Sequence, residues 1–338
     1  MAEKDKMKKI GDLLLNNAMY IIIAVAVVYI TIMRPSFLGI PSIVNILSLT
    51  AAKLPIALGI GGCIVLTGTD ISAGRVVGLT ACISASLLTT VFKVFPDMTN
   101  AAPLPLVLLL VIGVGALVGF VNGFSVAKFK LHPFIVTLST QLIVYGVILM
   151  YLMRGVNNGQ TLSGLADNYR SFITGTLFSI GGVAVPKYVL YSLILTIIMW
   201  VIWNKTTFGK NMFAVGSNEE AANVSGVNVM RTIIMVFMLA GMMYGITGFL
   251  DGARIASANA NTGLNYECDA IAACVIGGVS FVGGIGRISG IVVGVLLLQI
   301  IFTGLNFLAV DANMLYIIKG LIILIACAID MRKYLVRK

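Results

Sequence analysis

Long apolar runs separated by short polar segments dominate the chain. These runs approach the roughly 20 residues that an α-helix needs to cross a bilayer. The pattern predicts an all-α polytopic membrane protein of about ten transmembrane helices, forming a single transmembrane domain over residues 1–338. The runs lie near residues 18–33, 43–66, 76–92, 104–126, 133–153, 188–203, 232–250, 270–285, 288–308 and 314–330.

Two of these runs are interrupted. Lys53-Leu54-Pro55 falls inside the second run, and Gly277-Gly278 and Gly283-Gly284 fall inside the eighth. The first run also resembles the apolar part of a secretory signal peptide, but no Ala-x-Ala-like cleavage site follows it. We therefore expect it to remain as a helix.

The distribution of lysine and arginine predicts the orientation. The basic residues collect on the side that the positive-inside rule assigns to the cytoplasm, which places both termini inside. The composition, 59% hydrophobic and 11% charged, excludes a soluble globular protein, and the net charge of +10 reflects this bias rather than a nucleic-acid surface. The cytoplasmic set is Lys4, Lys6, Lys8, Lys9, Lys128, Lys130, Lys205, Lys210, Arg231, Arg332, Lys333, Arg337 and Lys338, and the opposite set is Arg34, Lys93, Arg154, Arg170, Lys187 and Arg254.

The two halves of the chain share a weak internal similarity. Residues 64–75 and 275–287 each carry a glycine-and-serine break followed by an arginine. This predicts two inverted five-helix repeats, over 18–153 and 188–331, of the kind that places the substrate at the repeat interface. The alternative is that two glycine-rich membrane helices resemble each other by chance.

Glycines recur at every fourth position in three runs. Such stripes let helix backbones approach closely, so we expect contacts within the bundle, with a homodimer seam as the alternative. The stripes are Gly115, Gly119 and Gly123, then Gly241 and Gly245, then Gly290 and Gly294.

Ionisable residues within an apolar stretch mark a candidate transport route. Asp70 and Arg75 lie in the segment 66–75, among hydroxyl residues and glycines. Burying one charge near the bilayer centre costs roughly 2.5–3.5 kcal/mol, so we expect both side chains to face protein or a hydrated cavity beside a helix break. We expect them to pair with each other or with Glu267 or Asp269, and the alternative role is to hold the bundle together.

Catalytic and metal chemistry is not indicated. The sequence contains no phosphate-binding GxxxxGK[ST] loop and no nucleophile beside a base. His132 precedes Pro133 and suggests a capping role, and the cysteines are expected to be small buried hydrophobes. They are Cys63, Cys82, Cys268, Cys274 and Cys327.

The polar loop 204–231 predicts a short surface helix on the cytoplasmic side. Ser217 and Glu220 have the spacing of a capping box, and Gly226 can end the helix in the left-handed conformation. Ala221 and Ala222 give it a small-residue face that suits docking to a cytoplasmic partner. The alternative is a plain connector.

Four motifs resemble a known family. Glu220-Ala221-Ala222 followed by Gly226 resembles the coupling loop of permease subunits of ATP-binding cassette importers. Together with residues 67–74, 204–209 and 266–273 it is similar to the ribose/galactose branch of those permeases, and Thr-Gly-Thr-Asp-Ile-Ser before Ala-Gly-Arg is similar to the galactose/methyl galactoside members. The loop lacks the downstream Leu-Pro of the fuller pattern.

The resemblance implies a bacterial inner-membrane importer. Two permease copies would act with two ATP-binding subunits and an external sugar-binding protein. ATP would be used by the partner subunit, so no catalytic residue and no cofactor is expected in this chain. The candidate route for galactose or methyl galactoside comprises Thr67, Thr69, Asp70, Ser72, Arg75, Asn122, Gln141, Glu267 and Asp269, and the coupling residues are Ser217, Glu220, Ala221, Ala222 and Gly226.

Other functions stay open at this point. The cargo of such an importer could equally be ribose or another monosaccharide. A proton-driven secondary transporter would also place Asp70, Glu267 and Asp269 in the membrane. A channel or scaffold subunit would need no coupling helix, and transport by the chain without an ATPase would favour either of these last two classes.

Overall fold

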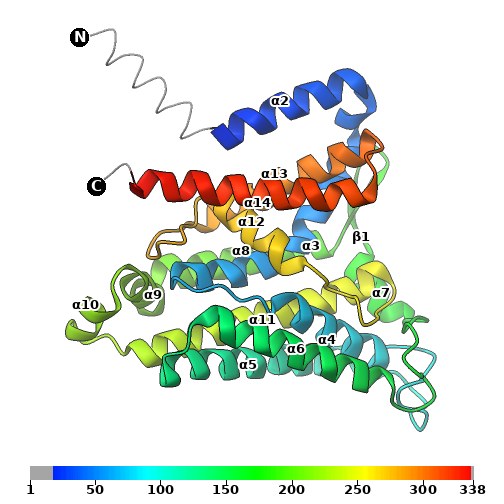
Figure 1. Ribbon diagram of the computed structural model, residues 1–338. Helices are drawn as coiled ribbons and strands as arrows, with labels where there is room; N and C mark the ends of the chain where they lie inside the picture. Colours follow the sequence, from blue (N-terminus) through cyan, green and yellow to red (C-terminus); the bar gives the residue numbers. More distant parts are fainter. Residues whose placement is uncertain (1–17, 336–338) are drawn as a thin grey trace.

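The computed structural model describes residues 18–335, whose regular secondary structure is helical apart from one short β-hairpin and two isolated bridges (Figure 1). Lys4, Lys6, Lys8, Lys9, Arg337 and Lys338 lie outside the described residues. The helices are α2 (Ala18–Met33), α3 (Ile40–Val65), α4 (Ala73–Leu87), α5 (Leu104–Phe129), α6 (Pro133–Leu152), α7 (Asp167–Thr174), α8 (Tyr188–Lys205), α9 (Thr207–Ser217), α10 (Glu219–Val224), α11 (Val229–Ile255), α12 (Tyr266–Ile276), α13 (Ile288–Phe307) and α14 (Ala312–Leu335), with a 3-10 turn at Pro35–Leu38.

Within residues 18–335, six helices are long and apolar enough to cross a membrane: α3, α5, α6, α8, α11 and α13. The chain is therefore a polytopic membrane protein. Of the most apolar 18-residue stretch of each helix, 72% is buried inside the protein in α3 and 67% in α11, against 22% in α8. The core thus forms around α3 and α11, and α8 presents most of its surface outward.

The second expected crossing is one continuous helix. α3 passes through Lys53 and Pro55 without ending. The eighth expected crossing, 270–285, is wrong in its second half, because α12 already ends at Ile276. Gly278 and Gly283 have φ of +82° and +88°, a backbone conformation that glycine adopts without a steric penalty, so the chain turns there.

The glycine stripes lie at helix contacts within the chain. A Cβ atom at Gly119 would lie 2.8 Å from the carbonyl carbon of Phe237, so only glycine allows α5 and α11 to pack this closely. Gly115 and Gly241 face each other in the same contact, and Gly290 faces Gly277 between α13 and α12. The expectation of contacts within the bundle is confirmed for these positions.

Two groups of short elements lie at opposite ends of the bundle. α9 and α10 lie at one end and α7 with the hairpin at the other (Figure 1). The hairpin joins β1 (Thr176–Ile180) to β2 (Val183–Pro186) through Gly181-Gly182, both with positive φ, as a two-residue turn requires. The sequence analysis did not predict it, although the glycine pair is a recognised hairpin signal.

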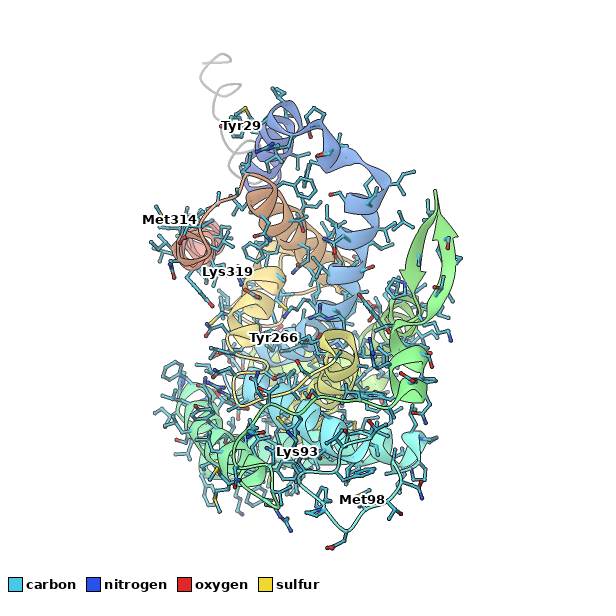
Figure 2. The ribbon with its side chains drawn as sticks, turned by 90° about the vertical axis from the view of Figure 1, so that its right-hand side faces the viewer. Tyr29, Lys93, Met98, Tyr266, Met314 and Lys319 are labelled. Atoms are coloured by element: carbon cyan, nitrogen blue, oxygen red, sulfur yellow. The ribbon has the colours of Figure 1, made fainter. Side chains whose placement is uncertain are left out.

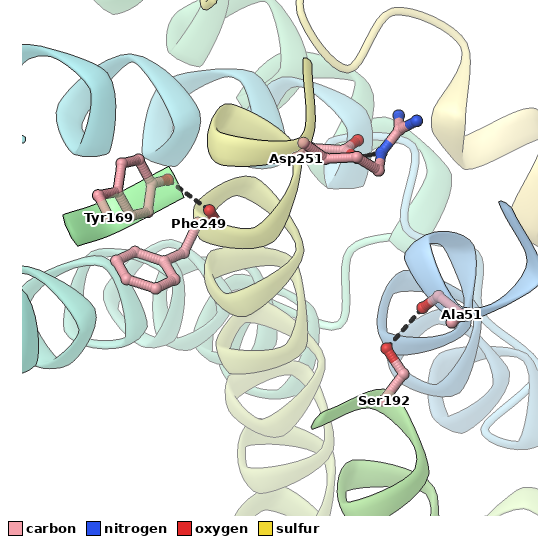
Figure 3. Close-up of polar contacts among 6 residues, drawn as sticks. Ala51, Tyr169, Ser192, Phe249 and Asp251 are labelled. Atoms are coloured by element: carbon pink, nitrogen blue, oxygen red, sulfur yellow. Dashed lines mark hydrogen bonds and ion pairs between the residues drawn. The ribbon is translucent and has the colours of Figure 1, made fainter. Parts of the chain in front are cut away.

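Buried hydroxyl groups join helices that are distant in sequence. Tyr169 of α7 donates to the carbonyl of Phe249 on α11, and Ser192 of α8 donates at 2.6 Å to the carbonyl of Ala51 on α3 (Figure 3). His132 is the N-cap of α6, where its ring accepts from the Phe134 amide, so the expected capping role is confirmed. Of the cysteines, Cys268 is exposed, which corrects the expectation of burial at that position.

Candidate functional site

The helical backbone is interrupted between α3 and α4, in the segment that carries Asp70. α3 ends at Val65, and Thr67 adopts a positive φ of 61° that turns the backbone. The amide of Gly68 returns to the Cys63 carbonyl at 3.0 Å, which satisfies one carbonyl at the helix end. The predicted helix break is confirmed, and α4 begins at Ala73.

Asp70 is fully buried beside this break. Its Oδ1 accepts hydrogen bonds from the Ser72 amide at 3.0 Å and the Ser72 hydroxyl at 2.6 Å. Its Oδ2 makes no hydrogen bond of ordinary geometry within residues 18–335, and neither does the buried hydroxyl of Tyr244. That hydroxyl lies beside the Asp70 carboxyl, so it is a donor that can pair with Oδ2. A buried polar atom without a well-formed hydrogen bond is uncommon, so these groups mark the break as a polar site inside an apolar bundle.

Side chains from α5 and α6 extend this polar network. The Asn122 amide donates to the Ser72 hydroxyl at 3.0 Å, and Thr140 donates to the Asn122 carbonyl oxygen at 2.6 Å. Thr137 accepts from the Ile71 amide and donates to the Thr69 carbonyl. Asp70, Ser72 and Asn122 are therefore brought together as expected, with Thr69 contributing its backbone.

The hydroxyl partners from α6 and α11 were not predicted. Thr137, Thr140 and Tyr244 lie in apolar runs without a distinguishing motif. Single hydroxyl residues are common in membrane helices, so the sequence offered no signal for these three. Gln141 is half-buried on α6, next to Thr140, and Thr67 is exposed, with its hydroxyl donating to the Leu66 carbonyl.

Arg75 does not pair with Asp70. Its guanidinium donates at 2.9 Å to the carbonyl of Ala260 and lies 4.2 Å from the ring centroid of Tyr145. The expected pairing with a carboxylate is wrong within the described residues, because the segment that follows α11 folds back onto α4 and offers a carbonyl. Glu267 packs directly against Gly74, one residue before Arg75, so it does lie beside the break.

Asp269 belongs to a different group. Its carboxylate pairs at 3.0 Å with the ammonium of Lys319 on α14. The expectation that Asp269 joins Asp70 and Arg75 is therefore wrong.

The short surface helix in the loop 204–231 is present as α10. Its N-cap is Asn218, whose side chain accepts from the Ala221 amide at 2.8 Å. The expected capping box from Ser217 to Glu220 is wrong, because Ser217 is still helical in α9 and donates to the Phe213 carbonyl. Asparagine is as good an N-cap as serine, so the helix begins one residue later than the motif suggested.

The C-terminus of α10 forms a complete Schellman motif. The Val227 amide donates to the Ala222 carbonyl at 3.1 Å, and the Gly226 amide donates to the Asn223 carbonyl at 3.0 Å. Gly226 has φ of +84°, as predicted. Ala221 is exposed, whereas Ala222 is buried against the protein, so the small-residue face points in two directions.

A groove of about 1000 Å³ separates α10 from the end of α5. It is open to the outside and its polar walls include Glu219, Glu220, Asn223 and Gly226 from the α10 side. Ala127 and Lys130 from α5 form the opposite wall, and Lys130 forms an ion pair with Glu219 across it. The groove, together with α10, is a surface that a protein partner can contact.

α9 connects this surface to two helix breaks, namely the one between α3 and α4 and the turn that follows α12. Gly216, at its C-terminal end, packs against the Val65 carbonyl where α3 ends and against Gly284 in the turn after α12. A Cβ atom at Gly216 would lie 2.9 Å from the Gly284 amide. α9 is therefore in direct contact with the end of α3 and with the turn that follows α12.

Comparisons with known proteins agree with this architecture. Residues 42–327 match the family model described as branched-chain amino acid transport system / permease component. The chain is 43% identical to the galactose/methyl galactoside import permease protein MglC of Haemophilus influenzae, with 97% of each chain covered. It is 42% identical to MglC of Escherichia coli, covering 95% of this chain and 96% of that one. The ribose import permease protein RbsC of Haemophilus influenzae is 33% identical over 95% of each chain. No solved structure gives a significant match to the chain.

Proposed function

The chain belongs to this family of transport-system permeases, and on that premise we propose that it is the membrane subunit of an ATP-binding cassette importer for galactose or methyl galactoside. The observation that carries the proposal is identity of 42–43% along nearly the whole chain to permeases named for these sugars. The chain is a pathway subunit of the bacterial inner membrane and not an enzyme. ATP hydrolysis belongs to a separate subunit.

Ribose is the second candidate cargo. A ribose permease is 33% identical over 95% of the chain, so the two groups of relatives share one architecture. The higher identity to the galactose group favours the hexose. Family membership disfavours a proton-driven secondary transporter, which would need no helix such as α10.

The proposed topology has ten crossings with both termini in the cytoplasm. Besides the six long apolar helices, α2, α4, α12 and α14 would complete the count. Support comes from the position of α10, at the end of the bundle opposite α7 and the hairpin (Figure 1). The division into inverted repeats at 18–153 and 188–331 stays a prediction.

The route is proposed to pass the break between α3 and α4. There Asp70, Ser72, Asn122 and Thr69 would exchange hydrogen bonds with sugar hydroxyls, and Glu267 would line the same region. The buried Asp70 carboxyl and the neighbouring Tyr244 hydroxyl support this, because both groups can exchange hydrogen bonds with sugar hydroxyls when the site opens. Thr67, Arg75, Gln141 and Asp269 are the remaining route candidates.

We assign α10 to docking with the ATP-binding subunit. Its caps hold a six-residue helix in place, and the groove beside it gives a partner room to engage Glu220, Ala221 and Gly226. Ser217 and Ala222 would support α10 from the side that faces the protein, because the exposed Ser217 contacts the turn after α12 and Ala222 is buried. ATP-driven movement of α10 would reach both breaks through α9.

The importer requires an ATP-binding subunit and an external sugar-binding protein as partners. We further propose that two copies of the permease assemble as a homodimer. The chain itself is proposed to bind no cofactor.

Uptake in a strain of the native host that lacks this gene tests the function. Radiolabelled galactose uptake at low concentration should fall and should return when the gene is supplied in trans, while ribose uptake stays unchanged. Loss of ribose uptake with galactose uptake unaffected would contradict the sugar assignment. Co-purification from the same host would identify the ATP-binding and sugar-binding partners directly.

A further inference from the structure

A second group of charged side chains meets inside the bundle, apart from the Asp70 network. Lys53, in the middle of α3, places its ammonium 2.7 Å from the ring centroid of Tyr266 on α12. Asp269, one turn along α12, pairs with Lys319 of α14, and Figure 2 shows Lys319 on that outer helix with Tyr266 deeper in the bundle. We call this group, which also contains Asp251 and Arg254 of α11, the Lys53 cluster.

The two carboxylates of the cluster form ion pairs with other cations, so Lys53 has no carboxylate as an ion-pair partner among the described residues. Arg254 binds Asp251 at 2.6 Å, and Lys319 binds Asp269 at 3.0 Å. Within residues 18–335, Lys53 has the Tyr266 ring as its only close partner. A charge inside a membrane helix costs roughly 2.5–3.5 kcal/mol, and a desolvated cation–π contact returns about 2 kcal/mol. Packing alone would therefore favour an apolar side chain at this position.

The polar groups around Lys53 converge on one small cavity. Its walls include Lys53, Tyr266, Asp269 and Gln299, which supply an ammonium, an aromatic face, a carboxylate and an amide, and the rest of its walls are apolar side chains of α3, α12 and α13. A sugar ring needs this combination, because its C–H face stacks on an aromatic ring and its hydroxyls require both donors and acceptors. In this conformation the cavity has room for about one water molecule, and the ammonium covers the ring face.

The cluster lies on the side of the Asp70 network away from α10. Asp251 and Arg254 are in the last two turns of α11, whereas α10 precedes the first turn of the same helix. A substrate that moves inward therefore meets the Lys53 cluster before it meets Asp70. Tyr266 is also linked to α11, since it lies beside the Asp251–Arg254 pair.

We propose that Lys53, Tyr266, Asp269 and Gln299 form a sugar-binding subsite in the outer part of the route. The sugar ring takes the face of Tyr266, and the Lys53 ammonium moves from that face to a sugar hydroxyl. The cargo is the neutral sugar of the proposed import function. The subsite gives the permease its own selectivity, in addition to that of the sugar-binding protein, and it rests on the proposed import function.

The test uses the assembled complex of permease, ATP-binding subunit and sugar-binding protein in proteoliposomes. Radiolabelled galactose uptake and ATP hydrolysis are measured in the same samples for Lys53→Met, Tyr266→Leu and Tyr266→Phe. Tyr316→Leu is the matched control, because Tyr316 is 60% exposed on α14. A second readout is the ratio of galactose to arabinose uptake, which a smaller amount of folded protein leaves unchanged.

Lys53→Met and Tyr266→Leu should each lower galactose uptake per ATP hydrolysed by at least about tenfold and shift the galactose-to-arabinose ratio. Tyr266→Phe and Tyr316→Leu should stay within about twofold of the wild type. Unchanged coupling and selectivity in both Lys53→Met and Tyr266→Leu would overturn the subsite alone. A wild-type complex that hydrolyses ATP but imports no galactose would overturn the proposed function, and the subsite with it.

Discussion

The carbonyl oxygen of Val65 accepts a 2.8 Å hydrogen bond from the backbone amide of Gly284. The two residues belong to the ends of the two interrupted segments, where α3 ends and where the chain turns after α12. Gly216 of α9 packs against the same carbonyl and the same amide. This three-way contact places α9, which leads into α10, between the two helix breaks. We therefore expect a conformational change of the ATPase to act on the membrane helices through this contact.

Gly216→Ala tests this contact. The added methyl group would overlap the Val65 carbonyl and lie 2.9 Å from the Gly284 amide, so α9 must shift. We expect ATP hydrolysis by the assembled complex to continue while galactose uptake falls by about tenfold or more. Gly113→Ala is the control, because nothing lies within 4 Å of a Cβ atom there. Normal uptake by Gly216→Ala would argue against transmission through this contact.

Substitutions on α10 test docking. Gly226→Pro cannot adopt the φ of +84° that ends the helix, and Glu220→Lys reverses a charge in the groove. Both should abolish transport and reduce co-purification of the ATP-binding subunit, while membrane insertion remains normal. Asp167→Lys, at an exposed position on α7 at the opposite end, should have neither effect. Binding of the ATPase and transport at the normal rate in both α10 variants would disprove the docking role.

Substitutions at Asn218 and Ser217 test which of the two residues caps α10. Asn218→Ala removes the acceptor for the Ala221 amide and should destabilise the helix by about 1 kcal/mol. Ser217→Ala should leave the exchange of that amide unchanged, since Ser217 bonds within α9. Hydrogen exchange at Ala221 measures the difference. Faster exchange of the Ala221 amide in Ser217→Ala than in Asn218→Ala would show that Ser217 is the cap after all.

Asp70→Asn tests whether the carboxylate serves transport. Asparagine keeps an oxygen that can accept both bonds from Ser72, so the break should keep its shape. The change should therefore lower galactose uptake more than it lowers thermal stability or expression. Asp167→Asn on the surface of α7 is the matched control. Equal losses of folding and uptake would show that Asp70 holds the bundle together instead.

Most of the helices could be predicted because local residues decide them, although the end of α12 at Ile276 could not. A run of apolar residues lowers its free energy by forming a helix in lipid, whatever its neighbours do. His132 and Gly226 were correctly identified at helix ends for the same reason, since capping involves atoms within a few residues. The cap of α10 is Asn218 and not Ser217, although both residue types can cap a helix. The local sequence does not distinguish them, whereas in the structure Ser217 packs against Gly284 at the end of α9.

The partners of the charged residues could not be predicted from the sequence. Lipid and protein interior are both apolar, so a membrane helix shows little periodicity that would reveal which face points inward. Nothing near Arg75 in the sequence indicates the carbonyl of Ala260, 185 residues away, and nothing near Lys53 indicates the ring of Tyr266. The sequence alone determined the helices, the break at Asp70 and the family, whereas the packing of α4, α11 and α12 decided which polar groups meet, because contacts between distant residues depend on how whole helices are placed.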